Sequence, residues 1–162
     1  MPEKKTTERT QRAKRQGKAP STQAGAYVHE EIEHVRKGKH GAKSTKQAIA
    51  IGLSKARRAG VKVGAPKKAS AATRRKAEQD SAKSGSRTKP SAKRSAATRQ
   101  ALTHASKTVA STSALSRQAK TAAKKRTAAS RSAAAKKAAR TKGAKGRSAA
   151  AKKAARTRKR AA

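Results

Sequence analysis

The sequence predicts a mostly disordered chain with one small all-α helical hairpin, and three observations lead to this prediction. The 162 residues carry a formal net charge of +39 and contain one Tyr and neither Phe nor Trp. The larger aliphatic side chains lie mainly between Tyr27 and Val63. Most of the remaining apolar content is alanine, which buries too little area to offset about 1–2 kcal/mol of backbone entropy per ordered residue. We therefore expect only the segment around these aliphatic residues to fold.

The charge is unevenly divided along the chain. Residues 1–80 hold 21 Lys and Arg and all 7 acidic residues, whereas residues 81–162 hold 25 Lys and Arg and no acid. This asymmetry predicts a compact part followed by a basic tail. Because so much unopposed positive charge repels itself, the natural partner of such a segment is a polyanion.

Residues 1–20 are expected to form a disordered basic arm, because Gly17 and Pro20 break any helix that starts there. Ser21 then offers an N-cap for a first helix, and Gly38 supplies its end. The apolar stripe of this helix has the helical spacing of 4, 4 and 3 residues. It consists of Ala24, Val28, Ile32 and Val35, with Tyr27 beside them.

A second helix is predicted to begin at Ser44, where Gln47 completes the capping-box pattern S-x-x-Q. After the helix ends, Gly60 is expected in the left-handed conformation, with Val61 packed against Ala56. The predicted apolar face consists of Ala48, Ile49, Gly52, Leu53 and Ala56.

Together the two predicted helices form an αα-hairpin over residues 21–63. Gly52, on the packing face, would permit close approach of the helices. A unit this small lies below the size at which chains usually fold unaided. The hairpin is therefore expected either to be marginally stable by itself or to form a homo-oligomer through Ile51 and the neighbourhood of Tyr27.

Residues 64–162 form an Ala-, Lys- and Arg-rich low-complexity tail. The sequence RSAAAKKAART at residues 131–141 recurs at residues 147–157, which gives a 16-residue repeat. Like-charge pairs such as Lys136 with Arg140 disfavour a helix by about 0.2–0.5 kcal/mol each. We expect the tail to be disordered in water and helical when phosphates neutralise it.

The segment STKQAIAIGLSKARRAG at residues 44–60, with the lead-in HEEIEHVRKG at residues 29–38, resembles a family of small basic bacterial proteins classed as a domain of unknown function. That resemblance implies a bacterial origin and brings no activity. The tail resembles bacterial histone H1-like proteins and the C-terminal domains of linker histones through its Lys-Ala-Ala and Ala-Lys-Lys units. The winged-helix domain of eukaryotic linker histones has no counterpart in the sequence, so nucleosome binding is not implied.

The sequence predicts no catalytic, cofactor-binding or metal-binding residue, and hence no enzyme. His29 and His34 are five residues apart, so they point about 140° apart on a helix and cannot share a metal ion as the H-E-x-x-H pattern requires. His29 with Glu33, or Glu30 with His34, would place two ligands on one face, with His40 as the only near third. We interpret this segment as a solvated polar face.

Glu30, Glu31 and Glu33 form the one acidic cluster of the hairpin. They are either plain surface charge or a dock for a basic segment, namely the tail or the Arg57–Arg58 end of the second helix. Such a dock would hold the hairpin together or restrain DNA binding.

The sequence favours a cytoplasmic protein. It contains no Cys, which fits a reducing compartment. No apolar run approaches the roughly 18 residues of a membrane span, and the N-terminus lacks the apolar region of a secretory signal. No membrane partner is expected.

The predicted function is non-sequence-specific binding of duplex DNA through its phosphate backbone, as in a histone H1-like protein of the bacterial nucleoid. The tail would compact DNA by charge neutralisation, and the hairpin would add a focused contact. The predicted nucleic-acid-binding residues are Lys124, Lys125, Arg126, Arg131, Lys136, Lys137, Arg140, Lys142, Lys145, Arg147, Lys152, Lys153, Arg156, Arg158, Lys159 and Arg160 in the tail, and Lys39, Lys43, Lys46, Arg57 and Arg58 in the hairpin.

Two alternatives remain open at this point. The chain is an RNA- or ribosome-associated basic protein, since polycationic tails bind RNA by the same physics. Otherwise the hairpin is a protein-interaction module that the tail localises.

Overall fold

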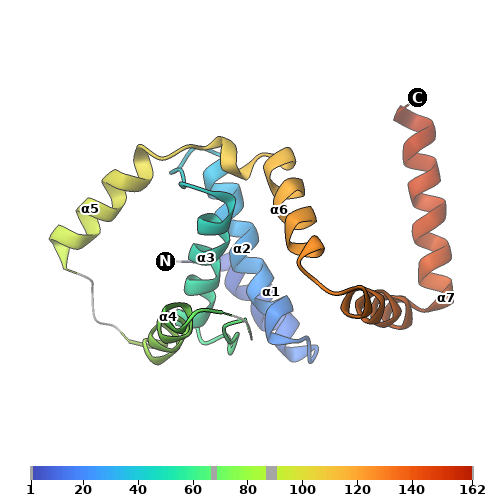
Figure 1. Cartoon of the computed structure of the whole chain (residues 1–162), viewed down its shortest axis with the longest axis horizontal. Coiled ribbons are helices and arrows are strands. Elements are labelled where there is room, and N and C mark those ends of the chain that lie inside the picture. The colour runs from blue at the N-terminus through green and yellow to red at the C-terminus, as the bar shows by residue number, and fades with distance from the viewer. Residues whose placement is uncertain (1, 67–68, 87–90, 162) are drawn as a thin grey trace. The chain divides into compact units, whose positions relative to one another are not determined.

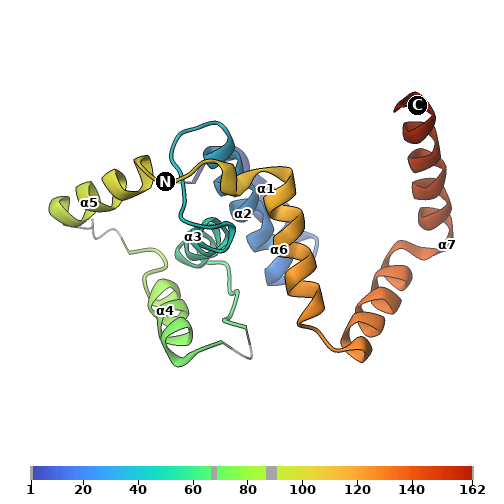
Figure 2. The same cartoon turned by 45° about the horizontal axis from the view of Figure 1, so that its top comes forward.

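The computed structural model describes residues 2–66, 69–86 and 91–161, which are helical with short connections (Figures 1 and 2). The chain divides into two compact units, Met1–Gln118 and Ala119–Ala162. None of the helices in these ranges is long and apolar enough to cross a membrane. The elements are α1 (Lys4–Arg15), α2 (Pro20–Arg36), α3 (Thr45–Arg58), α4 (Ala71–Ala82), α5 (Ala92–Thr103), the 3-10 helix η1 (Thr108–Ala110), α6 (Thr112–Lys124) and α7 (Ala128–Ala161).

The prediction of a mostly disordered chain is wrong, because helices run through most of the described residues, including the tail. Alanine, lysine and arginine have high helix propensity. In addition, a hydroxyl oxygen accepts a hydrogen bond from a backbone N–H three residues on, at 3.2–3.3 Å, before each of the four tail helices. The prediction of disorder gave more weight to the lack of apolar area and to charge repulsion than to helix propensity, and it did not consider the caps of these helices. The four capping residues are Ser70, Ser91, Ser111 and Thr127.

Residues 4–15 form α1 and not a disordered arm. α1 packs against α2, where the Thr10 hydroxyl donates to the backbone oxygen of Gln23 at 3.4 Å. The Glu3 backbone N–H, at the helix start, donates to Oε2 of Glu30 at 3.1 Å. The predicted break does occur, since α1 is followed by Gly17 at φ 63°.

The predicted hairpin is present as α2 and α3, which pack against each other (Figure 1). Its core contains the buried residues Ala24, Tyr27, Ala56 and Val61, with Leu53 and Val63 packed against them. Because Tyr27 is 1% exposed, it belongs to this core and offers no surface for self-association.

The face that α2 buries differs from the predicted stripe. The most buried positions are Ala24, Tyr27, Glu31 and Val35, each at most 1% exposed, whereas Val28 and Ile32 are half-buried. Helix α3 comes close to α2 at Val28, since a Cβ atom added at Gly52 would lie 2.6 Å from the Cα atom of Val28. The close approach expected at Gly52 is thus confirmed.

The ends of these helices follow the sequence signals, except at one position. α2 begins at Pro20, whose fixed φ angle suits the first helical position, and Ala19 is the N-cap in place of the predicted Ser21. Ser44 caps α3, because its Oγ accepts from the Gln47 N–H at 3.2 Å. Gly60 has φ 85°, and the Val61 N–H donates to the Ala56 oxygen at 3.0 Å.

The compact unit extends well past residue 63. α4 packs against α3, and the segment 102–110 returns to the loop between α2 and α3. There the Gly41 N–H donates to the Leu102 oxygen at 2.7 Å, and the Thr45 hydroxyl donates to the Val109 oxygen at 2.7 Å. These later residues were assigned to the tail because large apolar side chains are sparse there, Leu102 and Val109 being exceptions, yet backbone hydrogen bonds hold the segment to the loop.

Candidate nucleic-acid interface

α7 contains both copies of the repeat and bends between them. The bend is at Gly143, which has φ 64° and ψ 174° inside the helix. This region of backbone conformation is open essentially to glycine alone. Residues 131–141 therefore lie in a helix before the bend, and residues 147–157 lie in a helix after it.

Each repeat places three cations on one side of its helix. At 100° per residue, Lys136, Lys137 and Arg140 fall within a sector of about 100°, and Ala134 and Ala138 fall on the opposite side. The second copy repeats this arrangement 16 residues later with Lys152, Lys153 and Arg156. The repeat thus gathers three of its four cations on one side of the helix, and the fourth, Arg131 or Arg147, lies on the other side with small side chains.

All the predicted tail cations whose side chains the structure describes are exposed. Arg126 is hydrogen-bonded locally, since its Nη2 donates to the Ser130 oxygen at 3.1 Å. The side chain of Arg160 lies outside the described residues. The exposed cations are Lys124, Lys125, Arg126, Arg131, Lys136, Lys137, Arg140, Lys142, Lys145, Arg147, Lys152, Lys153, Arg156, Arg158 and Lys159.

The predicted hairpin cations do not form one surface. Lys43 and Lys46 are exposed, and neither has an ion-pair partner within the described ranges. Arg57 is 8% exposed, and its Nε donates to the Val63 oxygen at 2.8 Å. Arg57 therefore closes the end of α3 and offers little to a phosphate, whereas Lys43 and Lys46 remain available.

Arg58 is committed to α4. Its Nη2 lies 3.2 Å from Oδ1 of Asp80, a residue that is 1% exposed. Burial would raise the pKa of Asp80, but hydrogen bonds from Ser54 and Arg58 and the charges of Lys76 and Arg58 outweigh it and lower the pKa below its ordinary 3.8. Asp80 is thus an ionised carboxylate that ties α4 to α3.

The acidic cluster of α2 holds the hairpin together. Glu31 is 1% exposed, and its Oε2 accepts a hydrogen bond from Nζ of Lys55 at 2.6 Å. The same Nζ lies 3.8 Å from Oε1 of Glu30, while Glu33 pairs with Arg36 on its own helix. The cluster is therefore not a solvated face, and its partner on α3 is Lys55.

Sequence reasoning missed Lys55, although a signal was present. Lys55 follows Ala48 by seven residues and Gly52 by three, so it continues the packing stripe of α3. A cation on a packing stripe indicates an acidic partner on the facing helix, because buried charges are paired.

Glu3 joins the start of α1 to the end of α2. Its Oε1 lies 2.9 Å from Nε2 of His34 and 3.1 Å from Nζ of Lys39. The hydrogen bond with His34, followed by the hydrogen bond and charge of Lys39, lowers the pKa of Glu3 to about 2. Lys39 is therefore engaged within the protein, like Arg57 and Arg58.

Comparison with known proteins assigns no activity to this arrangement. No curated protein matches the chain, and no solved structure does. One family does match, over the segment that contains α2, the loop, α3 and the residues up to the start of α4. Residues 21–69 match the model of DUF6496, a family of unknown function, and this part of the chain is similar to that family.

Proposed function

We propose that the protein binds duplex DNA without sequence specificity, as a histone H1-like, nucleoid-associated protein that neutralises phosphate charge and compacts DNA. The observation that carries this proposal is the acid-free segment 81–162, in which each copy of the repeat presents Lys, Lys and Arg on one helix face. The proposal includes a bacterial cytoplasmic location, because the nucleoid lies there.

The dimensions of the repeat suit a duplex. Eleven residues of helix extend about 16 Å, and duplex DNA carries one negative charge per about 1.7 Å of its axis, so each copy passes about nine phosphate charges. Three cations per face are fewer than the phosphates they meet, so all three can be neutralised at once. Binding would thus relieve the repulsion among them.

The small side chains favour close approach. The major groove admits an α-helix, and alanine adds little to the helix diameter. Side chains that stack on bases are scarce, since Tyr27 is the only aromatic residue among Phe, Trp and Tyr and is buried. Contacts would therefore go to the backbone, and binding would be salt-sensitive and non-specific.

The experiment is a salt titration of duplex binding by the full chain and two doubly substituted variants. Lys136→Gln with Lys137→Gln removes two charges from the cationic face, and Arg131→Gln with Lys142→Gln removes two from the other side of the same helix. For the first variant, the slope of log K against log salt should fall by about 0.9 per lost phosphate contact. The second, matched in charge, should change the slope less.

Three results would overturn the proposal. The first is an affinity that does not depend on salt, and the second is an unchanged slope for the face variant. The third concerns the partner: a structured RNA of equal length that binds clearly more tightly at one salt concentration would replace duplex DNA by RNA. Equal loss in both variants would refute the role of the helix face and would leave a non-specific polycation.

A further inference from the structure

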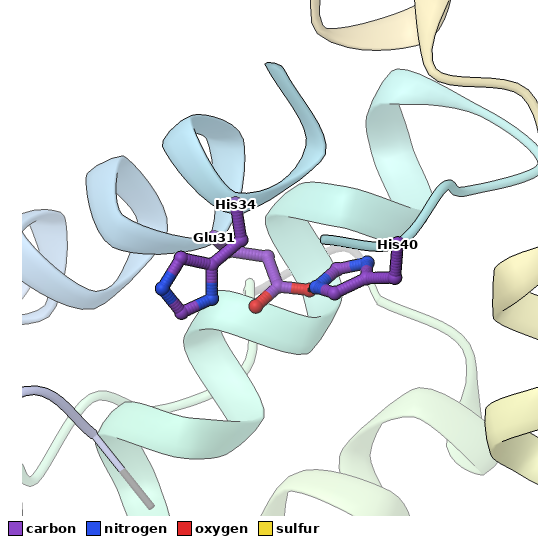
Figure 3. A group of neighbouring side chains, drawn as sticks. All are labelled: Glu31, His34 and His40. Atoms are coloured by element: carbon purple, nitrogen blue, oxygen red, sulfur yellow. The ribbon is translucent and has the colours of Figure 1, made fainter. Parts of the chain in front are cut away.

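The end of α2 and the loop after it bring three potential metal ligands together. Glu31 and His34 lie one turn apart on α2, and His40 lies in the loop before α3. One ligand atom from each residue lies within 4.8 Å of the other two. Figure 3 shows the carboxylate of Glu31 between the two imidazole rings. The sequence pointed to His34 with Glu30 and to His40 as a near third ligand, but it did not include Glu31, and the segment was interpreted as a solvated polar face.

The hydrogen bonds of the two rings leave one nitrogen of each facing the carboxylate. Nε2 of His34 bonds to Oε1 of Glu3 at 2.9 Å, and Nδ1 of His40 bonds to the Gly41 oxygen at 3.1 Å. Since a carboxylate and a carbonyl only accept, these two nitrogens carry the protons. In the neutral rings, Nδ1 of His34 and Nε2 of His40 are then free to bind a cation, and both face Glu31 in Figure 3. Such outer partners are typical of metal-binding histidines.

A buried carboxylate oxygen in the same group lacks a hydrogen-bond partner among the described residues. Glu31 is 1% exposed, and its Oε1 accepts no hydrogen bond from the described residues. The closest approach to it from the rings is Nε2 of His40 at 3.4 Å. If His40 is neutral, two lone pairs face each other there, so the position favours a cation between them.

We propose that Glu31, His34 and His40 bind a zinc ion. A tetrahedral zinc site with bonds of 2.0–2.1 Å has ligand atoms about 3.3–3.4 Å apart, and the separation between Glu31 and His40 already has this value. Rotation of the His34 ring and the Glu31 carboxylate would bring in the third ligand. The fourth position is left to water, since the side chains of His34 and His40 are 14% and 19% exposed.

The loop that carries His40 is held from both sides. Gly38, at φ 74°, turns the chain out of α2. Beyond His40, the N–H groups of Gly41 and Ala42 donate to the segment 102–106 at 2.7 and 2.9 Å. A Cβ atom at Gly41 would lie 1.8 Å from the Ala105 oxygen, so the two segments are in direct contact. These contacts hold the backbone of His40 in place beside α2.

One cation near the site opposes metal binding. Nζ of Lys55 occupies the other oxygen of Glu31 at 2.6 Å. Glu31 can bind Lys55 and a metal ion at the same time, because Lys55 bonds to Oε2 and leaves Oε1 for the metal ion. The nearby charge weakens the attraction for a divalent ion, so we expect a weaker site than one with three unshared ligands.

The experiment uses the full chain, freed of metal with a chelator, in phosphate-free buffer. Added Co²⁺ should give the visible absorption of a tetrahedral ion at one equivalent, and Zn²⁺ should abolish it by displacement. His34→Ala and His40→Ala should each lower the Zn²⁺ affinity by more than about 100-fold, and Glu3→Gln should lower it about tenfold. The controls are His29→Ala and His104→Ala, because these exposed histidines lie outside the group.

Two results would overturn the proposal: no tetrahedral Co²⁺ spectrum with the unsubstituted chain, or equal loss of affinity in the control variants. In the first case, Oε1 of Glu31 is satisfied by a protonated His40 and not by a metal ion. Emission from Tyr27, in the adjoining core, shows whether each variant is folded. If a histidine variant is unfolded, the Co²⁺ spectrum of the unsubstituted chain and the Glu3→Gln affinity decide the question.

Discussion

Replacing Gly52 by alanine tests the close packing of α2 and α3. The added Cβ atom would lie 2.6 Å from the Val28 Cα, 3.0 Å from the Val28 nitrogen and 3.1 Å from the Tyr27 oxygen. All three are backbone atoms, so no side chain can rotate away, and the helices must separate. Overpacking of this kind costs about 1–3 kcal/mol. Alanine also gains about 1 kcal/mol in helix propensity over glycine.

Gly25→Ala is the matched control for that substitution. Gly25 also lies inside a helix of the hairpin, but a Cβ atom there meets nothing within 4 Å. It should stabilise the protein by up to about 1 kcal/mol from propensity alone. The difference in unfolding free energy between the two variants therefore isolates the overlap, and we expect about 1–3 kcal/mol in favour of Gly25→Ala.

Urea unfolding followed by tyrosine fluorescence measures this difference directly. Tyr27 is the only Tyr in the chain, which has no Trp, and it is 1% exposed in the hairpin core. Its emission therefore reports on the hairpin and not on the tail helices. A Gly52→Ala protein as stable as Gly25→Ala would refute the close approach.

Two further predictions concern charged residues of the first unit. Arg57→Gln should lower the unfolding free energy by about 1–3 kcal/mol with a small effect on DNA affinity, because the Arg57 guanidinium bonds to the Val63 oxygen. Lys46→Gln, at an exposed position, should lower the DNA affinity with a small effect on the unfolding free energy. A larger loss of DNA affinity for Arg57→Gln than for Lys46→Gln would contradict this assignment. Since the pKa of Asp80 is lowered in the fold, its stabilisation should be complete above the ordinary value of 3.8 and should disappear as the pH falls below it. Acid unfolding of Asp80→Asn should lack this component, and identical pH profiles would exclude it.

Local signals in the sequence predicted the hairpin well. Ser44, Gly38 and Gly60 act where expected, because caps and left-handed turns depend on a few adjacent residues. The buried face of α2 was not predicted correctly, because it includes the charged Glu31, which is paired with Lys55 of α3. Apolar patterning does not place charged residues in a core.

In the candidate sites too, features set by neighbouring residues could be predicted from the sequence, and features set by tertiary contacts could not. The cationic face of each repeat follows from helical spacing and could be derived once the tail was known to be helical. The group of Glu31, His34 and His40 could not, because His40 is placed by a loop that residues 102–106 hold, far along the chain. Contacts of that separation leave no periodic signal.

The bonds from Gly41 and Ala42 to the segment 102–106 also bear on the order of folding. Closing a loop of about sixty residues costs about 3.6 kcal/mol of chain entropy by its length alone, against about 1.8 kcal/mol for the roughly eight residues between α2 and α3. The hairpin should therefore form first, with the loop between α2 and α3 already in the conformation to which the segment 102–106 binds. The hairpin is also synthesised before residue 102, and N-terminal parts of a chain generally fold first during synthesis, so the later segment is expected to dock onto a hairpin that is already formed.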